Sequence, residues 1–202
     1  RRGREQLAWE FGGVAAAAAI ALAVILFVLP KPRPDTVRFE VPTPSTIQSQ
    51  DSPRISPDGR TLAYSATDSI GTTRIWLRPL GALTAQALPG TEGAKRPFWS
   101  PDSRFLAFVA GGKLKKVSIA GGPPTVICDA PSGSDGSWGS RDVILFDGTG
   151  PDPIWRVPAG GGIATPQVLS VMGGKAGQVG WPEFLPDGRH FLYLSILPVP
   201  TL

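Results

Sequence analysis

The stretch Ser56-Pro-Asp-Gly-Arg60, followed by the strand-like run Thr61-Leu-Ala-Tyr-Ser65, decides the fold because the same pattern returns along the chain. The turn recurs as Ser100-Pro-Asp-Ser-Arg104 and Leu185-Pro-Asp-Gly-Arg189, and a degenerate copy without proline lies at Trp138-Gly-Ser-Arg-Asp142. Ser, Pro and Gly at the first, second and fourth positions are the residues that a type I turn favours. Each copy therefore marks a turn between two expected strands.

A second motif gives the length of the repeat. Arg78, Val117 and Val157 occupy matching positions before Gly-containing turns, and they are spaced 39 and 40 residues apart. A period near 40 residues with about four strands per unit is typical of β-propeller blades. We therefore predict an all-β fold, an incomplete β-propeller of about three and a half four-stranded blades. The blades are expected at about 51–90, 91–130, 131–170 and 176–202.

The expected strands are apolar on both faces. In Phe105-Leu-Ala-Phe-Val109, for example, neither the odd nor the even positions are polar. A sheet with one solvated face would alternate with polar residues, so neighbouring blades are expected to cover both faces. The flank of the last blade should then expose apolar residues and strand edges. Either further blades follow, which is the simpler explanation, or a homo-oligomer covers this flank. The tryptophans at matching blade positions are interpreted as core residues: Trp76, Trp99, Trp138, Trp155 and Trp181.

A charge-free apolar run of nineteen residues, FGGVAAAAAIALAVILFVL, occupies Phe11 to Leu29. A helix of this length is roughly 28 Å long, close to the hydrocarbon thickness of a bilayer. The run is too long for the apolar part of a signal peptide, and no small-x-small cleavage site follows it. We therefore predict a juxtamembrane segment at 1–10, an uncleaved transmembrane α-helix at 11–29 before the propeller, and a Pro-rich linker at 30–50. Lys and Arg number three on each side, which leaves the orientation open.

The charge and cysteine content limit the classes of partner and cross-link that this chain can have. The net charge is +4, and the basic residues are scattered except for Lys113, Lys115 and Lys116. A solvated strand edge explains these lysines better than a nucleic-acid patch, so no nucleic-acid partner is expected. The single cysteine, Cys128, excludes an internal disulfide and is interpreted as a small buried hydrophobe.

Residues that could carry chemistry are few. The single histidine, His190, has no Cys or His partner near it in the sequence, which argues against a metal site. The sequence also lacks a Gly-x-Ser-x-Gly elbow, a phosphate loop before a helix and an Asp-rich calcium loop. Asp58, Asp102 and Asp187 are interpreted as turn formers rather than ligands or acids. We predict no catalytic, cofactor-binding or metal-ligating residue, and no cofactor.

The repeats resemble a known family. Phe98-Trp-Ser-Pro-Asp-Ser103, Ile119-Ala-Gly-Gly-Pro-Pro124 and Trp181-Pro-Glu-Phe-Leu-Pro-Asp-Gly188 are similar to the TolB-type, WD40-like β-propeller repeat. The order of anchor, linker and blades resembles the C-terminal half of bacterial receptor-type serine/threonine protein kinases. That resemblance implies a cytoplasmic kinase domain upstream and a propeller on the periplasmic side of the inner membrane, held by a single-pass anchor. This span has no kinase motif, so no catalytic residue is carried over.

Ser134-Asp-Gly-Ser-Trp138 is faintly similar to the Asp-box turn of sialidase propellers, but it lies where an inner strand is expected and is interpreted as structural.

Three functions are compatible with these patterns. The first is an extracytoplasmic sensor or protein-interaction propeller that reports to an upstream kinase. The second is a TolB-like envelope scaffold. The third is the propeller domain of a peptidase whose hydrolase domain follows. No enzymatic activity is expected of this segment, and the sequence does not identify its protein or small-molecule ligand.

Overall fold

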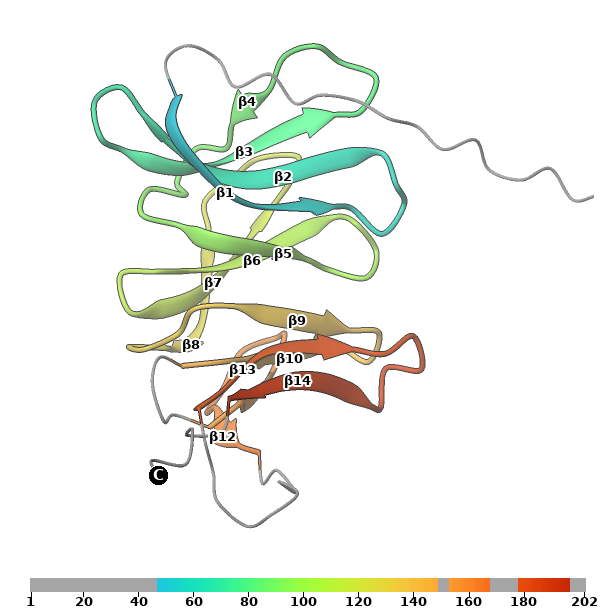
Figure 1. Ribbon diagram of the computed structural model, residues 1–202. Coiled ribbons are helices and arrows are strands. Elements are labelled where there is room, and N and C mark those ends of the chain that lie inside the picture. The colour runs from blue at the N-terminus through green and yellow to red at the C-terminus, as the bar shows by residue number, and fades with distance from the viewer. Residues whose placement is uncertain (1–46, 149–152, 168–177, 197–202) are drawn as a thin grey trace, which may run out of the picture. The chain divides into compact units, whose positions relative to one another are not determined.

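Antiparallel sheets make up the structure, a computed structural model that describes residues 47–148, 153–167 and 178–196 (Figure 1). Three sheets have four strands each and the last is a pair, with the strands of each sheet in chain order. The first sheet contains β1 (Ile47–Ile55), β2 (Thr61–Asp68), β3 (Thr73–Pro79) and β4 (Gln86–Ala87). The second contains β5 (Lys95–Trp99), β6 (Phe105–Ala110), β7 (Lys113–Ser118) and β8 (Thr125–Asp129). The third contains β9 (Gly136–Gly139), β10 (Val143–Phe146), β11 (Trp155–Pro158) and β12 (Thr165–Pro166). The pair is β13 (Gln178–Phe184) and β14 (Phe191–Ile196).

These sheets are consistent with a partial propeller and are called blades 1 to 4 in chain order, and the all-β prediction is confirmed. Blade 1 begins at Ile47, which pairs with Asp68 of β2, so it includes the last residues of the segment expected as linker. The predicted helix at 11–29 lies outside the described residues. Within the described ranges, no helix is long and apolar enough to cross a membrane.

The Ser-Pro-Asp turns fold as the sequence predicts. The backbone N–H of Gly59 donates to the carbonyl oxygen of Ser56 at 2.8 Å, which closes the turn. The Asp58 carboxylate accepts hydrogen bonds from the Ser56 hydroxyl and from the backbone N–H of Arg60. Asp102 repeats both bonds in blade 2. Gly59 has φ 71°, a left-handed conformation that glycine adopts without strain.

Both faces of blade 2 are buried, which confirms the prediction made from its apolar strands. Leu106 and Phe108 of β6 pack with Ile75 of blade 1 in one apolar cluster. Val109 belongs to a second cluster that includes Ile144 of blade 3. Successive side chains of a strand point to opposite faces, so a strand between two blades is apolar at every position.

The flank of blade 4 is apolar and exposed, as the sequence predicts for a blade without a following neighbour. Phe191 and Tyr193 of β14 pack with Leu145 of blade 3. The alternate residues, Leu192 and Leu194, are 62% and 50% exposed. The two faces of β14 therefore differ because only one of them has a blade against it.

The interpretation of the lysine run as a strand edge was wrong. Lys113 and its neighbours lie on β7, which pairs with both β6 and β8. Lys113 forms an ion pair with Asp129 at 2.5 Å, and the Lys116 ammonium donates to the carbonyl oxygen of Ala159 in blade 3 at 2.8 Å. The prediction for Cys128 is confirmed: the thiol is buried, and burial raises its pKa.

The tryptophans do not all lie in the core. Trp99 and Trp138 are buried, as expected. Trp181 is 42% exposed, so its interpretation as a core residue was wrong. The reason is local, since β13 has a bulge between Gly180 and Glu183 and Trp181 takes φ 51° there. A bulge breaks the alternation of side chains along a strand and redirects the residue within it.

Candidate functional site: the axial cluster

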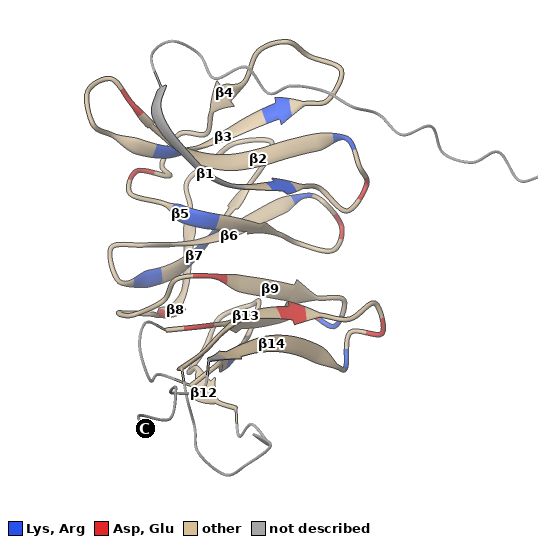
Figure 2. Ribbon diagram, viewed as in Figure 1, with Lys and Arg blue, Asp and Glu red and all other residues tan. Residues whose placement is uncertain are grey.

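The first strands of the four blades lie side by side (Figure 1). β1 contacts β5, β5 contacts β9, and β9 contacts β13, each being the end strand of its own sheet. Figure 2 shows basic residues on β1 and β5 and acidic residues on or next to β9 and β13. We call Arg54, Arg96, Asp135, Asp147 and Glu183 the axial cluster. All four blades contribute to it.

Arg54 joins blade 1 to blades 3 and 4. Its Nη2 donates to both oxygens of the Asp135 carboxylate, at 3.2 and 3.0 Å. Its Nη1 lies 3.9 Å from Glu183 Oε2. The Asp135 side chain is only 5% exposed, whereas that of Arg54 is 37% exposed. A buried carboxylate needs a partner to offset its lost hydration, and Arg54 supplies it.

Asp147 joins the inner strands of blades 3 and 4. Its Oδ1 accepts the backbone N–H of Asp135 at 2.7 Å, and its Oδ2 accepts the backbone N–H of Trp181 at 2.8 Å. A Cβ placed on Gly180 would lie 2.8 Å from that Oδ2, so glycine is needed for this approach. We call this arrangement the Asp147 clamp. It accepts one backbone donor at the bulge of β13, the Trp181 N–H, and one directly before β9, the Asp135 N–H.

Arg96 and Trp181 occupy matching bulges in blades 2 and 4. Each residue precedes a proline, and each has a left-handed φ, 43° for Arg96 and 51° for Trp181. The Arg96 guanidinium lies 5.9 Å from the centre of the Trp181 ring, within the range of a cation–π contact. Blades 2 and 4 are thus joined across the axis, as Arg54 joins blades 1 and 3.

Burial perturbs the acidic members of the cluster. The pKa of Asp147 is raised, mainly because the buried carboxylate loses hydration, although its two backbone hydrogen bonds oppose the change. Loss of hydration also raises the pKa of Glu183, and Arg54 opposes that change. The Glu183 side chain remains 63% exposed, so solvent limits the effect there. The cluster therefore contains carboxylates that are costly to ionise beside fixed cations.

A pocket of about 200 Å³ opens over the cluster. Aromatic side chains form part of its wall, and Arg54 and Glu183 bring both signs of charge to it. The Trp99 indole N–H donates to the Arg54 carbonyl oxygen at 3.0 Å, which fixes β1 against β5. We call this the axial pocket. Its lining residues come from the first strands and first turns: Arg54, Ile55, Pro57, Phe98, Trp99, Pro101, Gly136, Ser137, Trp138 and Glu183.

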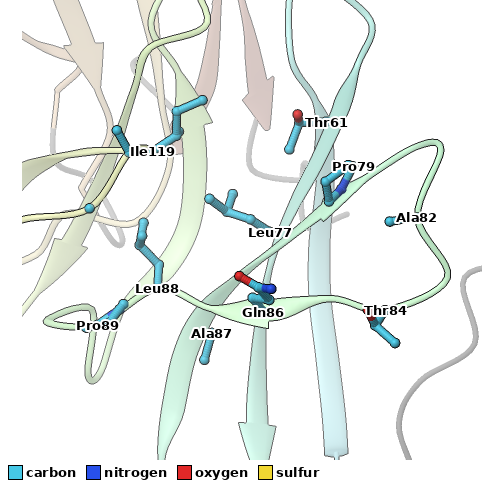
Figure 3. Close-up of a pocket in the computed structure, with 12 residues that line it drawn as sticks. Thr61, Leu77, Pro79, Ala82, Thr84, Gln86, Ala87, Leu88, Pro89 and Ile119 are labelled. Atoms are coloured by element: carbon cyan, nitrogen blue, oxygen red, sulfur yellow. The ribbon is translucent and has the colours of Figure 1, made fainter.

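A second cavity, of about 430 Å³, lies between blades 1 and 2 and has a different character. Figure 3 shows Leu77, Leu88 and Ile119 pointing toward one another in it. Among the residues that the structure describes, no charged side chain lines this groove. It can accept an apolar group but offers little to orient one.

The residues singled out in the sequence have structural roles. Asp187 accepts two backbone N–H groups of its turn, and its other oxygen contacts His190 Nδ1 at 2.5 Å. These bonds lower the pKa of Asp187. Among the described residues, no group of three or more His, Cys, Asp or Glu could hold a metal ion. Asp135, from the stretch compared with an Asp-box, directly precedes inner strand β9, where the sequence places an inner strand.

Sequence reasoning missed the axial cluster. A signal for it was present, since Arg54 and Glu183 both stand two residues before the first residue of their turns. A charged residue at the same position of two inner strands indicates a wall that faces a polar axis.

No protein-family model matches the sequence. The uncharacterized peptidase YuxL of Bacillus subtilis is 34% identical over 103 residues, which are 44% of this chain and 15% of the peptidase. A TolB-type protein from Agrobacterium tumefaciens superposes with a TM-score of 0.61 at 23% identity, over 70% of this chain and 52% of that one. TolB from Acinetobacter baumannii gives 0.60 at 17% identity, over 72% and 37%.

The chain therefore has a TolB-like β-propeller fold, and a peptidase is among its distant relatives. It spans 15% of the length of YuxL and 52% of the A. tumefaciens protein.

Proposed function

We propose that this chain is a non-catalytic β-propeller module that binds a polypeptide segment at the axial pocket. The observation that carries the proposal is the axial pocket itself, where aromatic walls meet Arg54 and Glu183. Polypeptide-binding surfaces are enriched in aromatic residues and Arg at their centre. A peptide bond offers donors and acceptors together, and its side chains offer either charge.

The rigidity of the pocket supports recognition. Arg54 is held by Asp135, and Trp99 is held by the Arg54 carbonyl oxygen. Glu183 is the more exposed partner, and at 3.9 Å it is only weakly tied to Arg54. An incoming basic group can therefore engage Glu183 while Arg54 remains in place. Side chains that are fixed before binding lose less entropy when a ligand arrives.

A peptidase is the parent protein that the relatives favour. The similarity to YuxL includes nearly half of this chain. In such a protein, the propeller would deliver or admit polypeptide substrates to a hydrolase domain elsewhere in the sequence. A TolB-like scaffold without a hydrolase uses the same binding surface and differs only in its neighbouring domains.

The receptor-kinase architecture is the second candidate, and the N-terminal sequence favours it. The apolar run at 11–29 and the Pro-rich segment at 30–50 have the order of a membrane anchor and a spacer. In a receptor kinase of this kind, the propeller is a periplasmic sensor at the inner membrane, and the binding of a polypeptide is the signal that it detects. The coding sequence on both sides distinguishes the two parents, because one needs kinase motifs upstream and the other needs a Gly-x-Ser-x-Gly elbow downstream.

Binding is tested with the full chain in detergent micelles and a library of random dodecapeptides. Enriched peptides are expected, and their affinity should fall about tenfold in Glu183→Ala and in Arg54→Ala. Glu183 is exposed, so its variant should fold normally, and Arg60→Ala in the first turn is the matched surface control. Failure to enrich any peptide, or affinities that neither substitution changes, would overturn the proposal.

A further inference from the structure

A pocket of about 250 Å³ between blades 3 and 4 contains three arginines and no acidic residue. Arg141 belongs to the β9–β10 turn, Arg156 to β11 and Arg189 to the β13–β14 turn. Gln167 adds an amide to the same lining. We call this the arginine pocket. It uses different residues from the axial pocket.

None of these three arginine side chains forms an ion pair with any residue that the structure describes. The matching turn of blade 2 behaves differently, because Arg104 Nε lies 3.2 Å from Asp102 Oδ2. In blade 4 the equivalent carboxylate, Asp187, instead forms hydrogen bonds with His190 and with two backbone N–H groups. This substitution of partners leaves the Arg189 guanidinium without the carboxylate that its counterpart has.

The carboxylate that follows Arg141 in the chain also has a hydrogen-bond partner of its own. Asp142 follows Arg141 in the chain, and its Oδ1 accepts the indole N–H of Trp138 at 3.4 Å. Three cations around one small cavity repel one another, and the described residues that line the cavity include no acidic side chain. A bound anion removes that repulsion.

We propose that the arginine pocket binds a phosphate group. Guanidinium groups present paired N–H donors whose spacing fits the oxygens of phosphate, and they stay charged at every physiological pH. Phe184 and Phe191 line the same pocket, with ring centres 6.3 Å apart in an edge-to-face arrangement. The pocket can therefore hold a phosphate that carries an organic part against this aromatic wall. Two sources supply such a group, a soluble phosphorylated molecule and the headgroup of an anionic lipid.

The test is calorimetric titration of the full chain in zwitterionic detergent with three probes: inorganic phosphate, glycerol 3-phosphate and water-soluble dihexanoyl phosphatidic acid. Binding is expected for at least one probe, and it should weaken as salt is added because the arginines are exposed. Arg156→Gln and Arg189→Gln should each lower the affinity about tenfold. Arg104→Gln, at the matching turn of blade 2, should leave it unchanged.

The probes distinguish the source. Equal binding of glycerol 3-phosphate and phosphatidic acid supports a soluble ligand, and tighter binding of phosphatidic acid supports a lipid headgroup. The proposal is overturned if no probe binds, or if Arg104→Gln weakens binding as much as Arg156→Gln and Arg189→Gln. Circular dichroism of each variant checks that the blades remain folded.

Discussion

The interface between blades 2 and 3 differs from the interface between blades 3 and 4, although one strand, β10, contributes to both. On the first side, Ile144 belongs to a large apolar cluster that includes Phe98 and Trp138. On the second side, Leu145 belongs to a small cluster with Val179, and partly buried aromatic rings complete it.

Polar contacts supplement the smaller interface. The Asp147 clamp binds the backbone of blade 4, and the Ser137 hydroxyl accepts the backbone N–H of Phe184 at 3.1 Å. Apolar packing is insensitive to pH and tolerates some variation in shape, whereas a clamp depends on single atoms. The difference shows that repeated blades can be joined by different physical means within one chain.

Shortening one side chain on each face of β10 to alanine should have the largest effect on stability. Equal losses on the two faces would show that the two interfaces do not differ in the way described. Ile144→Ala is expected to cost about 4 kcal/mol of unfolding free energy, because Ile144 is fully buried in the larger cluster. Leu145→Ala should cost less, about 2–3 kcal/mol, because partly exposed rings can move into the space. Urea unfolding followed by tryptophan fluorescence measures both, and Val126→Ala at an exposed position is the control.

Removal of the Asp147 clamp should cause the next largest loss of unfolding free energy. Asp147→Ala leaves two backbone N–H groups without an acceptor, and we expect a loss of about 2–3 kcal/mol. Asp147→Asn keeps one acceptor oxygen and should lose about half as much. The same urea titration gives both values. If Asp147→Ala is neutral, blade 4 does not depend on the clamp.

The sequence predicted the blades well because each blade repeats the same local chemistry. The Ser-Pro-Asp turns and strands such as β6 are determined by neighbouring residues and by burial on two faces. The axial cluster could not be found in this way, because Arg54 and Asp135 are 81 residues apart and each is a single charged residue in its own strand. Trp181 was misjudged for a related reason, since only the pairing of β13 with β14 reveals the bulge that turns it outward.

The Asp147 clamp and the Ser-Pro-Asp turns should contribute to stability with opposite dependence on pH. The native pKa of Asp147 lies above the ordinary value of 3.8, so the native state holds more protons, and stability falls as pH rises from 3.8 toward the raised pKa. The native pKa of Asp102 is lowered, chiefly by its hydrogen bond from Ser100, so its contribution is lost as pH falls below 3.8. Asp147→Asn should reduce the first slope and Asp102→Asn the second, as measured by urea unfolding between pH 3 and 7. Neither slope should vanish, because Glu183 also has a raised pKa and Asp187 a lowered one. A slope that neither substitution changes would contradict this assignment.

The smallest effect concerns the turn geometry that all blades share. Gly59→Ala should cost about 1 kcal/mol, because φ 71° strains any residue with a Cβ although the space around it is open. Gly160→Ala is the matched control, since that glycine also has open space and lacks a positive φ. Thermal unfolding of the pair measures the difference, and equal midpoints would show that the turn conformation is not required.

The most direct test of the propeller arrangement is a double-mutant cycle between Arg54 of blade 1 and Asp135 of blade 3. These blades are not neighbours in sequence, and their inner strands meet only if the sheets are arranged around a common axis. Unfolding free energies of Arg54→Ala, Asp135→Ala and the double variant should give a coupling energy of about 1–3 kcal/mol. A coupling energy of zero would contradict the shared axis and the site built on it.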